Sequence, residues 1–298
     1  MLELGIGADL VRGIGLVLWG LLAVALLVAL FKPKTITGKV LSSLLVLGIF
    51  FGPMVPGAIA AHEYRQKYEK AKALFDERCK TAGEKIYRTV EGVEGVLLVN
   101  TRGKLHSGNT NDQNWEGAGF PGESSGNQYI FEFLYYNTPA YKNRARDLSP
   151  KKQLNSVRGY HFVEIEESDG RYRYTMGDAS QNGPPGSTDR VFGFGSRELT
   201  TAPVPRYTIS YENIPDPEGR AHGVAGGKVK VVDRTTNEIL GEFTRYSFDT
   251  GLGGTGGFRD PWGWAATYGP RCPQTKYGLA DGHIRSFVEQ VIKPKQGN

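Results

Sequence analysis

The chain has 298 residues, a formal net charge of +5 and 22% charged residues. The positive charge is modest and spread out, without a block of five like charges, which argues against nucleic acid as a partner. Glycine is abundant, with 40 residues, and most of the excess follows residue 91 between short apolar runs. This composition favours a β-domain with many tight turns over a helical bundle.

Two uncharged apolar stretches, residues 13–31 and 40–61, stand near the N-terminus. Each is about the ~20 residues that a helix needs to cross ~30 Å of hydrocarbon. The linker, residues 32–39, is too short for more than a tight connection. The sequence therefore predicts that residues 1–61 are an N-terminal tail and a two-pass transmembrane hairpin, with the lipid bilayer as a partner.

The second stretch carries helix-modifying residues in its C-terminal half. Pro53 and Pro56 are expected to kink or break the helix there. Gly48 and Gly52, four residues apart, would permit close packing against the first helix. The same spacing makes self-association through the membrane helices possible.

Charges around the two stretches bear on sidedness. Lys32, Lys34 and Lys39 lie in the linker without an acidic residue, and short lysine-rich loops stay cytoplasmic. This places the C-terminal domain outside the cytoplasm, in the periplasm of a bacterium, with the hairpin in the inner membrane. The opposing evidence is a group of basic residues directly after the second stretch: Arg65, Lys67, Lys70 and Lys72.

Residues 62–88 are predicted to form a juxtamembrane amphipathic helix. Its apolar positions recur at spacings of three and four. They are Tyr64, Tyr68, Ala71, Phe75, Cys79, Ala82 and Ile86. The stripe fits a helix laid on its own β-domain, and it also fits a stalk that forms a homo-oligomer.

Residues 89–298 are predicted to form a β-rich soluble domain that closes with a C-terminal helix around residues 284–292. Residues 159–166 and 171–176 flank Ser168-Asp169-Gly170 as a hairpin, and residues 228–233 pair with 238–248. Polar loops are expected at 103–127 and 178–190. The expected fold class is membrane-anchored α+β, with a mainly antiparallel sandwich or open barrel.

The chain contains two cysteines, Cys79 in the juxtamembrane helix and Cys272 near the end. They can form one disulfide, which requires an oxidising compartment. The alternative is two unrelated free thiols in a cytosolic domain.

Two glycine motifs match known signatures only in part. Residues 122–126 read G-x-S-x-G around Ser124, but loop residues precede them where a nucleophile elbow requires a strand. Residues 251–256 read G-x-G-x-x-G, but Pro261 opposes the long helix of a dinucleotide fold. An anion nest formed by Gly251, Gly253, Gly254 and Gly256, beside Arg259, is the remaining functional interpretation, and ordinary turn glycines are the alternative.

The densest group of aromatic and cationic residues lies just beyond these glycines. It consists of Arg259, Trp262, Trp264, Tyr268 and Arg271. Tryptophan and arginine on a Gly/Pro-rich segment are typical of binding hot spots, although the tryptophans could also fill the core beside Cys272. The five histidines show no paired metal-ligand spacing, so neither a metal nor a cofactor is expected.

The leading hypothesis is a non-enzymatic inner-membrane protein whose extracytoplasmic β-domain binds a protein partner or a cell-envelope component. A second hypothesis is a cytoplasmic, ligand-gated membrane effector that senses a nucleotide or small anion. The third is an envelope serine hydrolase that uses Ser124.

Overall fold

Helices make up the N-terminal part of the chain. The computed structural model describes residues 6–102, 112–134, 159–176, 194–256, 259–273 and 283–295. Helix α1 spans Ile6–Phe31 and α2 spans Ile36–Phe51. A 3-10 turn, η1 (Gly52–Met54), holds Pro53 near its start and leads into α3 (Val55–Cys79), so the helix is interrupted where the prolines predicted a break. Residues 1–67 and 68–298 form two separate units.

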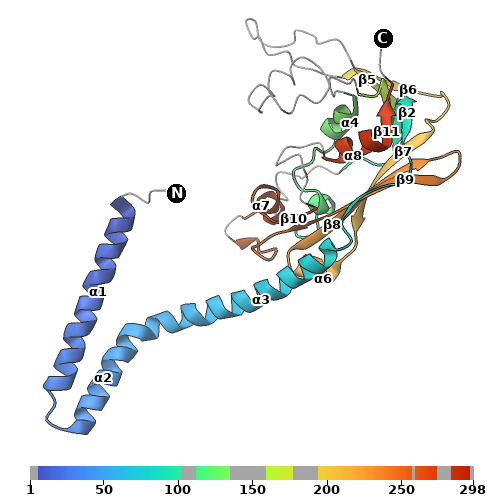
Figure 1. Cartoon of the computed structure of the whole chain (residues 1–298). Coiled ribbons are helices and arrows are strands. Elements are labelled where there is room, and N and C mark those ends of the chain that lie inside the picture. The colour runs from blue at the N-terminus through green and yellow to red at the C-terminus, as the bar shows by residue number, and fades with distance from the viewer. Residues whose placement is uncertain are drawn as a thin grey trace, which may run out of the picture. The chain divides into compact units, whose positions relative to one another are not determined.

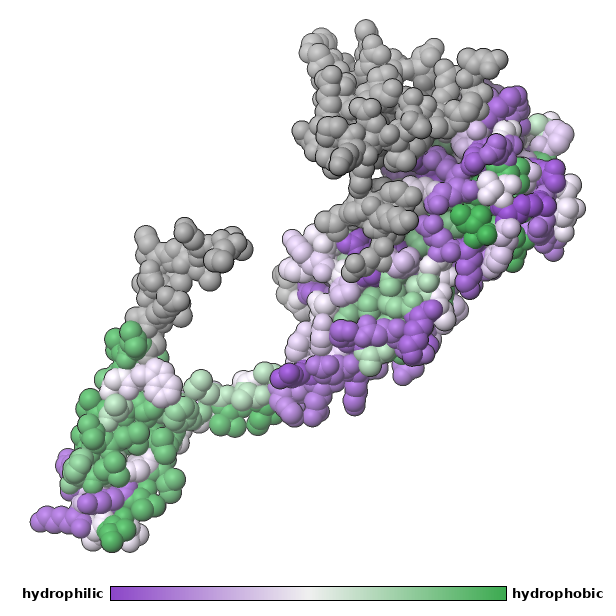
Figure 2. Space-filling view, viewed as in Figure 1, coloured by the Kyte–Doolittle hydropathy of each residue, from purple (hydrophilic) through white to green (hydrophobic). Residues whose placement is uncertain are grey.

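One helical run is long and apolar enough to cross a membrane, by length and composition only. It covers Ile36–Cys79, with a mean hydropathy of 2.1 in its most apolar 18-residue window, and none of that window is buried. A shorter apolar stretch covers Leu16–Phe31. Figure 2 shows the hydrophobic surface over this part of the chain. Of the two predicted spans, one thus meets the joint test of length and composition over the described residues.

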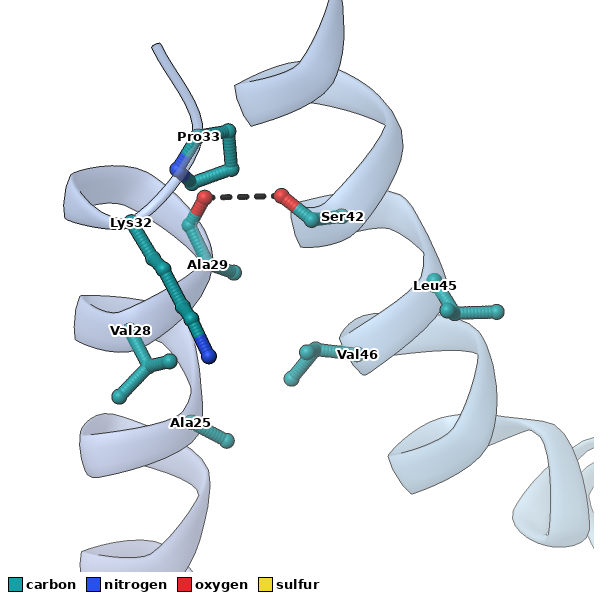
Figure 3. Close-up of a pocket in the computed structure, with 8 residues that line it drawn as sticks. All are labelled: Ala25, Val28, Ala29, Lys32, Pro33, Ser42, Leu45 and Val46. Carbon is teal, nitrogen blue, oxygen red and sulfur yellow. Dashed lines mark hydrogen bonds between the residues drawn. The ribbon is translucent and has the colours of Figure 1, made fainter.

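Helices α1 and α2 contact each other near the segment that joins them. The Ser42 hydroxyl donates a hydrogen bond of 2.8 Å to the carbonyl oxygen of Ala29 (Figure 3). An apolar groove of about 480 Å³ lies at this end of the pair, with Lys32 at its margin. Its lining residues are Ala25, Val28, Ala29, Lys32, Pro33, Ser42, Leu45 and Val46.

The second unit is built on one large mixed sheet. Its strands run in the order β1-β9-β8-β7-β3-β4-β5-β6, and β10 pairs with β9 beyond this path. The bounds are β1 Gly83–Ile86, β3 Gly95–Leu98, β4 Phe162–Glu167, β5 Gly170–Met176, β6 Phe194–Leu199, β7 Tyr207–Ile214, β8 Val224–Asp233, β9 Glu238–Phe248 and β10 Arg271–Cys272. Strands β2 (Val90–Val93) and β11 (Ile292–Pro294) form a small parallel sheet.

Several sequence predictions are confirmed here, and two need correction. The β4–β5 and β8–β9 hairpins pair as predicted. The large sheet is mainly antiparallel, as predicted, but β3 pairs in parallel with both β4 and β7, and the described strands form no two-sheet sandwich. The helix predicted at residues 62–88 is part of α3 and ends at Cys79 instead of residue 88, because Gly83, at φ 138°, starts β1 on the edge of β9.

The main core lies between one face of the sheet and two helices, α4 (Asn127–Leu134) and α8 (His283–Val291), as Figure 1 shows. The predicted C-terminal helix is α8, and Phe287 packs on Phe243 of β9 with ring centroids 5.5 Å apart. The opposite face of β9 carries Tyr246 and Phe248, which pack against Ala71 and Phe75 of α3. The stripe of α3 therefore lies on its own domain, the first of the two interpretations.

A buried carboxyl group on α8 makes core stability depend on pH. Burial raises the pKa of Glu289 from 4.5 to about 7, against the attraction of Arg285, whose Nε lies 3.1 Å from Oε1. Between these values the folded state keeps a proton that the unfolded state has lost, so stability falls as pH rises from 4.5 to 7.

We expect Glu289→Gln to remove this loss. The difference in unfolding free energy between the variant and the wild type should be about 1–3 kcal/mol more in favour of the variant at pH 8 than at pH 5. Urea unfolding of the full-length protein in detergent at both pH values measures the difference. Glu166→Gln, which changes an exposed carboxylate of β4, is the control. An equal gain at both pH values would contradict the prediction.

Candidate binding site

The aromatic segment predicted as a binding site lies between β9 and β10 and folds around a short helix, α7 (Pro261–Thr267). Asp260 caps the helix, since its side chain accepts a 3.1 Å hydrogen bond from the amide of Trp262. Pro261 takes the first helical turn, where no amide hydrogen is needed. Because the segment is helical, the two tryptophans, which are two residues apart, point in different directions.

Trp262 belongs to the core. It is fully buried with Ala118, Ala225 and Ala265, and its indole Nε1 donates to the carbonyl of Asp112 at 3.1 Å. The guanidinium of Arg220 lies 5.1 Å from the centroid of its ring. Trp262 thus anchors α7 to the sheet, which corresponds to the core interpretation of this residue.

Trp264 and Tyr268 lie on the other side of α7 and reach solvent. Their side chains are 50% and 73% exposed, and their ring centroids are 5.0 Å apart. The guanidinium of Arg259 lies 5.5 Å from the Trp264 ring centroid. Three of the five predicted residues therefore form one group at the surface, in which Arg259 is partly buried; we call it the α7 aromatic face: Arg259, Trp264 and Tyr268.

The predicted anion nest holds a carboxylate of the chain itself. The amides of Gly251 and Gly253 donate to Asp249 at 3.2 and 2.9 Å, and Arg259 forms an ion pair with the same carboxylate. The Gly254 amide donates to the Gly251 carbonyl, and Gly256 lies two residues beyond this turn. An external anion at these glycines stays a prediction, and it would have to displace Asp249.

Arg271, the fifth predicted residue, lies away from the α7 aromatic face, on β10. Its neighbour Cys272 faces α3, where the Cα atoms of Cys79 and Cys272 are 5.5 Å apart, within the range for a disulfide. The structure thus confirms a disulfide-capable pair. Burial lowers the pKa of Arg271, which is half-buried.

Ser124 lies between the 3-10 turn η2 (Glu116–Gly119) and α4, after loop residues instead of a strand. Its hydroxyl donates to Glu132, and within the described residues no histidine forms a hydrogen bond with it. A catalytic role for Ser124 stays untested. No group of three or more His, Cys, Asp or Glu residues in the described part of the chain could hold a metal.

Three buried arginines near this region were not predicted from the sequence: Arg102, Arg220 and Arg245. Arg102 donates to the carbonyls of Gly117 at 3.0 Å, Phe120 at 2.7 Å and Ser124 at 2.8 Å, and also to that of Glu123. Arg220 donates to carbonyls of the 112–116 segment and to Asn213. The third, Arg245, lies on the same inward face of β9 as Phe243. Residues two apart on a strand share a face, so the strand pattern could have indicated this position.

Comparisons with known proteins add no functional assignment. The chain matches no protein-family model, no curated protein and no solved structure.

Proposed function

We propose that this chain is a non-enzymatic protein of the bacterial inner membrane, anchored by a two-helix hairpin, whose β-rich domain lies outside the cytoplasm and binds a protein partner or envelope component. The apolar helical run supports the anchor, because a wholly unburied apolar surface of this length is unfavourable in water. The contact of Ser42 with Ala29 supports a paired arrangement of the two apolar segments.

The α7 aromatic face is the observation that carries the binding proposal. Exposed tryptophan and tyrosine side chains beside a partly buried arginine are typical of interface hot spots. Here the group stands on a short helix that Trp262 and the Asp260 cap hold rigidly. A rigid aromatic group loses little conformational entropy on binding, which favours affinity.

The variants Trp264→Ala and Trp262→Ala separate binding from folding. Trp264→Ala should leave the unfolding free energy within about 0.5 kcal/mol of the wild type and abolish partner binding. Trp262→Ala should cost about 3–5 kcal/mol of unfolding free energy, because it empties a fully buried site. Urea unfolding in detergent measures the stabilities.

Binding is read in cells with a photo-crosslinking residue in place of Tyr268. Discrete adducts are expected from position 268, and they should disappear when Trp264→Ala is added. The same crosslinker in place of Glu198, an exposed residue of β6, is the matched control. Adducts that persist in the Trp264→Ala background, or that also form from position 198, would contradict binding through the α7 aromatic face.

A cytoplasmic, ligand-gated effector is the second candidate, and the basic residues after the second apolar stretch favour it: Arg65, Lys67, Lys70 and Lys72. The two candidates differ in the state of the cysteine pair. An external domain predicts an oxidised pair in cells, whereas a cytoplasmic domain predicts two free thiols.

A further inference from the structure

Two arginines lie together on the inward face of the β9–β10 pair. Arg271 stands directly opposite Ser247 in the antiparallel register, and Arg245 lies two residues from Ser247 along β9. Alternation along a strand puts all three side chains on the same face of the sheet. Diagonal neighbours of this kind are close enough for long side chains to meet.

Arg245 forms only a long ion pair with Glu123, without a hydrogen bond, and the Arg271 side chain has no ion-pair partner among the described residues. Arg245 is 2% exposed, and its Nε and Nη1 atoms have no hydrogen-bond acceptor among the described residues. The nearest carboxylate oxygen, Glu123 Oε1, is 4.0 Å from Nη1, which is too long for a hydrogen bond. The side chain of Arg271 also makes no hydrogen bond or ion pair within the part of the chain that the structure describes.

The electrostatics of the pair are unfavourable without a further anion. Burial lowers the pKa of Arg245 to about 10; Glu123 opposes this shift, and the charges of Arg271 and Arg102 add to it. The positive charges of Arg271 and Arg102 therefore repel that of Arg245, and Glu123 is the carboxylate that attracts it. Burying a cation without a hydrogen-bonded partner is strongly unfavourable.

We propose that Arg245 and Arg271 bind a protonated oxyanion of the hydrogen phosphate type, with Glu123 at its edge. Guanidinium groups donate in a planar fork that matches the oxygen atoms of such an ion. The P–OH group of hydrogen phosphate can donate to the Glu123 carboxylate, which would repel an ion without a proton. The ion enters from the side of Arg271, because Arg245 is buried and Arg271 is half-buried. This site goes beyond the proposed partner binding and does not depend on it.

The first test measures phosphate binding by the purified full-length protein in detergent, by equilibrium dialysis and by the midpoint of thermal unfolding. We expect one saturable phosphate per chain and a midpoint that rises with phosphate at constant ionic strength. Sulfate, which has the same shape but no proton at neutral pH, should bind at least tenfold more weakly. Glycerol 3-phosphate, with the same chemical group on a larger molecule, distinguishes a site for free phosphate from one open to phosphate esters.

Three variants assign the effect to this site. Arg271→Gln should weaken phosphate binding at least tenfold, whereas Arg234→Gln, at an exposed arginine in the β8–β9 turn, should not change it. Glu123→Gln should reduce the preference for phosphate over sulfate. Arg245→Met removes the buried cation, so without phosphate it should be at least as stable as the wild type, and phosphate should no longer stabilise it.

Two results would overturn the proposal. One is the absence of phosphate binding to the wild type at millimolar concentration. The other is a rise of the unfolding midpoint that is equal for phosphate and sulfate and unchanged in Arg271→Gln, which would be a general salt effect.

Discussion

Arg102→Ala is expected to destabilise the β-domain by about 3–5 kcal/mol, since it removes a buried cation and leaves its hydrogen-bonded partners unsatisfied. Arg102 is 1% exposed, and its two terminal nitrogens together donate to four carbonyl groups between Gly117 and Ser124. Its guanidinium lies over the rings of Trp115 and Tyr211, 5.7 and 5.4 Å from their centroids.

The effect should be large because Arg102 donates to the carbonyls of Glu123 and Ser124 and adds a second donor to those of Gly117 and Phe120, which also accept from backbone amides of the segment. Residues 117–124 make no pairing with a strand, and η2 lies so close to β8 that a Cβ at Gly119 would overlap the backbone of Gly226 and Gly227. Such a close approach buries carbonyl groups away from water, and a buried carbonyl without a donor is costly. Arg102 is therefore the side chain that allows η2 to lie on the sheet.

Urea unfolding of the full-length protein in detergent measures the loss. Arg102→Lys keeps the charge, but one ammonium group cannot reproduce a planar fork with four acceptors, so it should recover only part of the stability. Arg234→Ala, at an exposed arginine, should change stability by less than about 0.5 kcal/mol. A cost below about 1 kcal/mol for Arg102→Ala, or full recovery in Arg102→Lys, would contradict this role.

Local signals predicted the parts of this fold that depend on neighbouring residues. The Asp169-Gly170 turn and the polar residues after Asp233 each join two runs that pair as hairpins, because turn chemistry and strand alternation act over a few positions. The apolar stripe of α3 could also be predicted, since residues three and four apart share a helix face.

The sequence could not indicate pairings that join distant segments. The run at β3 is apolar at nearly every position, so it carries no alternation to show that its partners, β4 and β7, are parallel and far along the chain. Arg102 likewise lies in a polar context, and nothing local distinguishes it from an exposed arginine. Its burial results from a segment that returns about 20 residues later.

The aromatic group shows an intermediate case. On a Gly/Pro-rich segment with no predicted helix, Trp262 and Trp264 are equivalent candidates, yet Asp260-Pro261 is a helix start signal. On a helix, side chains two positions apart point about 200° apart, so one tryptophan would be expected inside and the other outside. Asp249 gave a similar signal, since aspartate before glycines tends to bind backbone amides of its own turn.

Loss of the disulfide is the second large effect we expect. Cys79 ends α3 and Cys272 ends β10, with a sequence separation of 193 residues. Closing a loop of this length restricts the unfolded chain by up to about 5 kcal/mol in the chain-entropy model, and measured values are commonly 2–4 kcal/mol. Cys272→Ser should therefore lower the unfolding free energy by about 2–5 kcal/mol and the melting temperature by roughly 5–15 °C.

The folded domain should keep its architecture in this variant, because α3 has other contacts with the sheet. Phe75 packs on Phe248 with ring centroids 5.5 Å apart, and Arg78 Nε forms an ion pair of 2.8 Å with Asp216. Cys79→Ser and the double variant should show the same loss as Cys272→Ser, since each opens the same loop. If the losses were additive, each thiol would have a separate packing role and the disulfide account would be wrong.

The oxidation state of Cys79 and Cys272 in cells also indicates the compartment in which the domain lies. Thiols are blocked in intact cells before lysis, and the protein is run on a gel without reductant. An oxidised monomer is more compact and should migrate faster than the reduced chain, which is the result expected for an extracytoplasmic domain. Two blocked thiols with unchanged mobility would instead place the domain in the cytosol. The stability that the bridge supplies would then be absent in the cell, and the basic residues after the second apolar stretch would decide the topology.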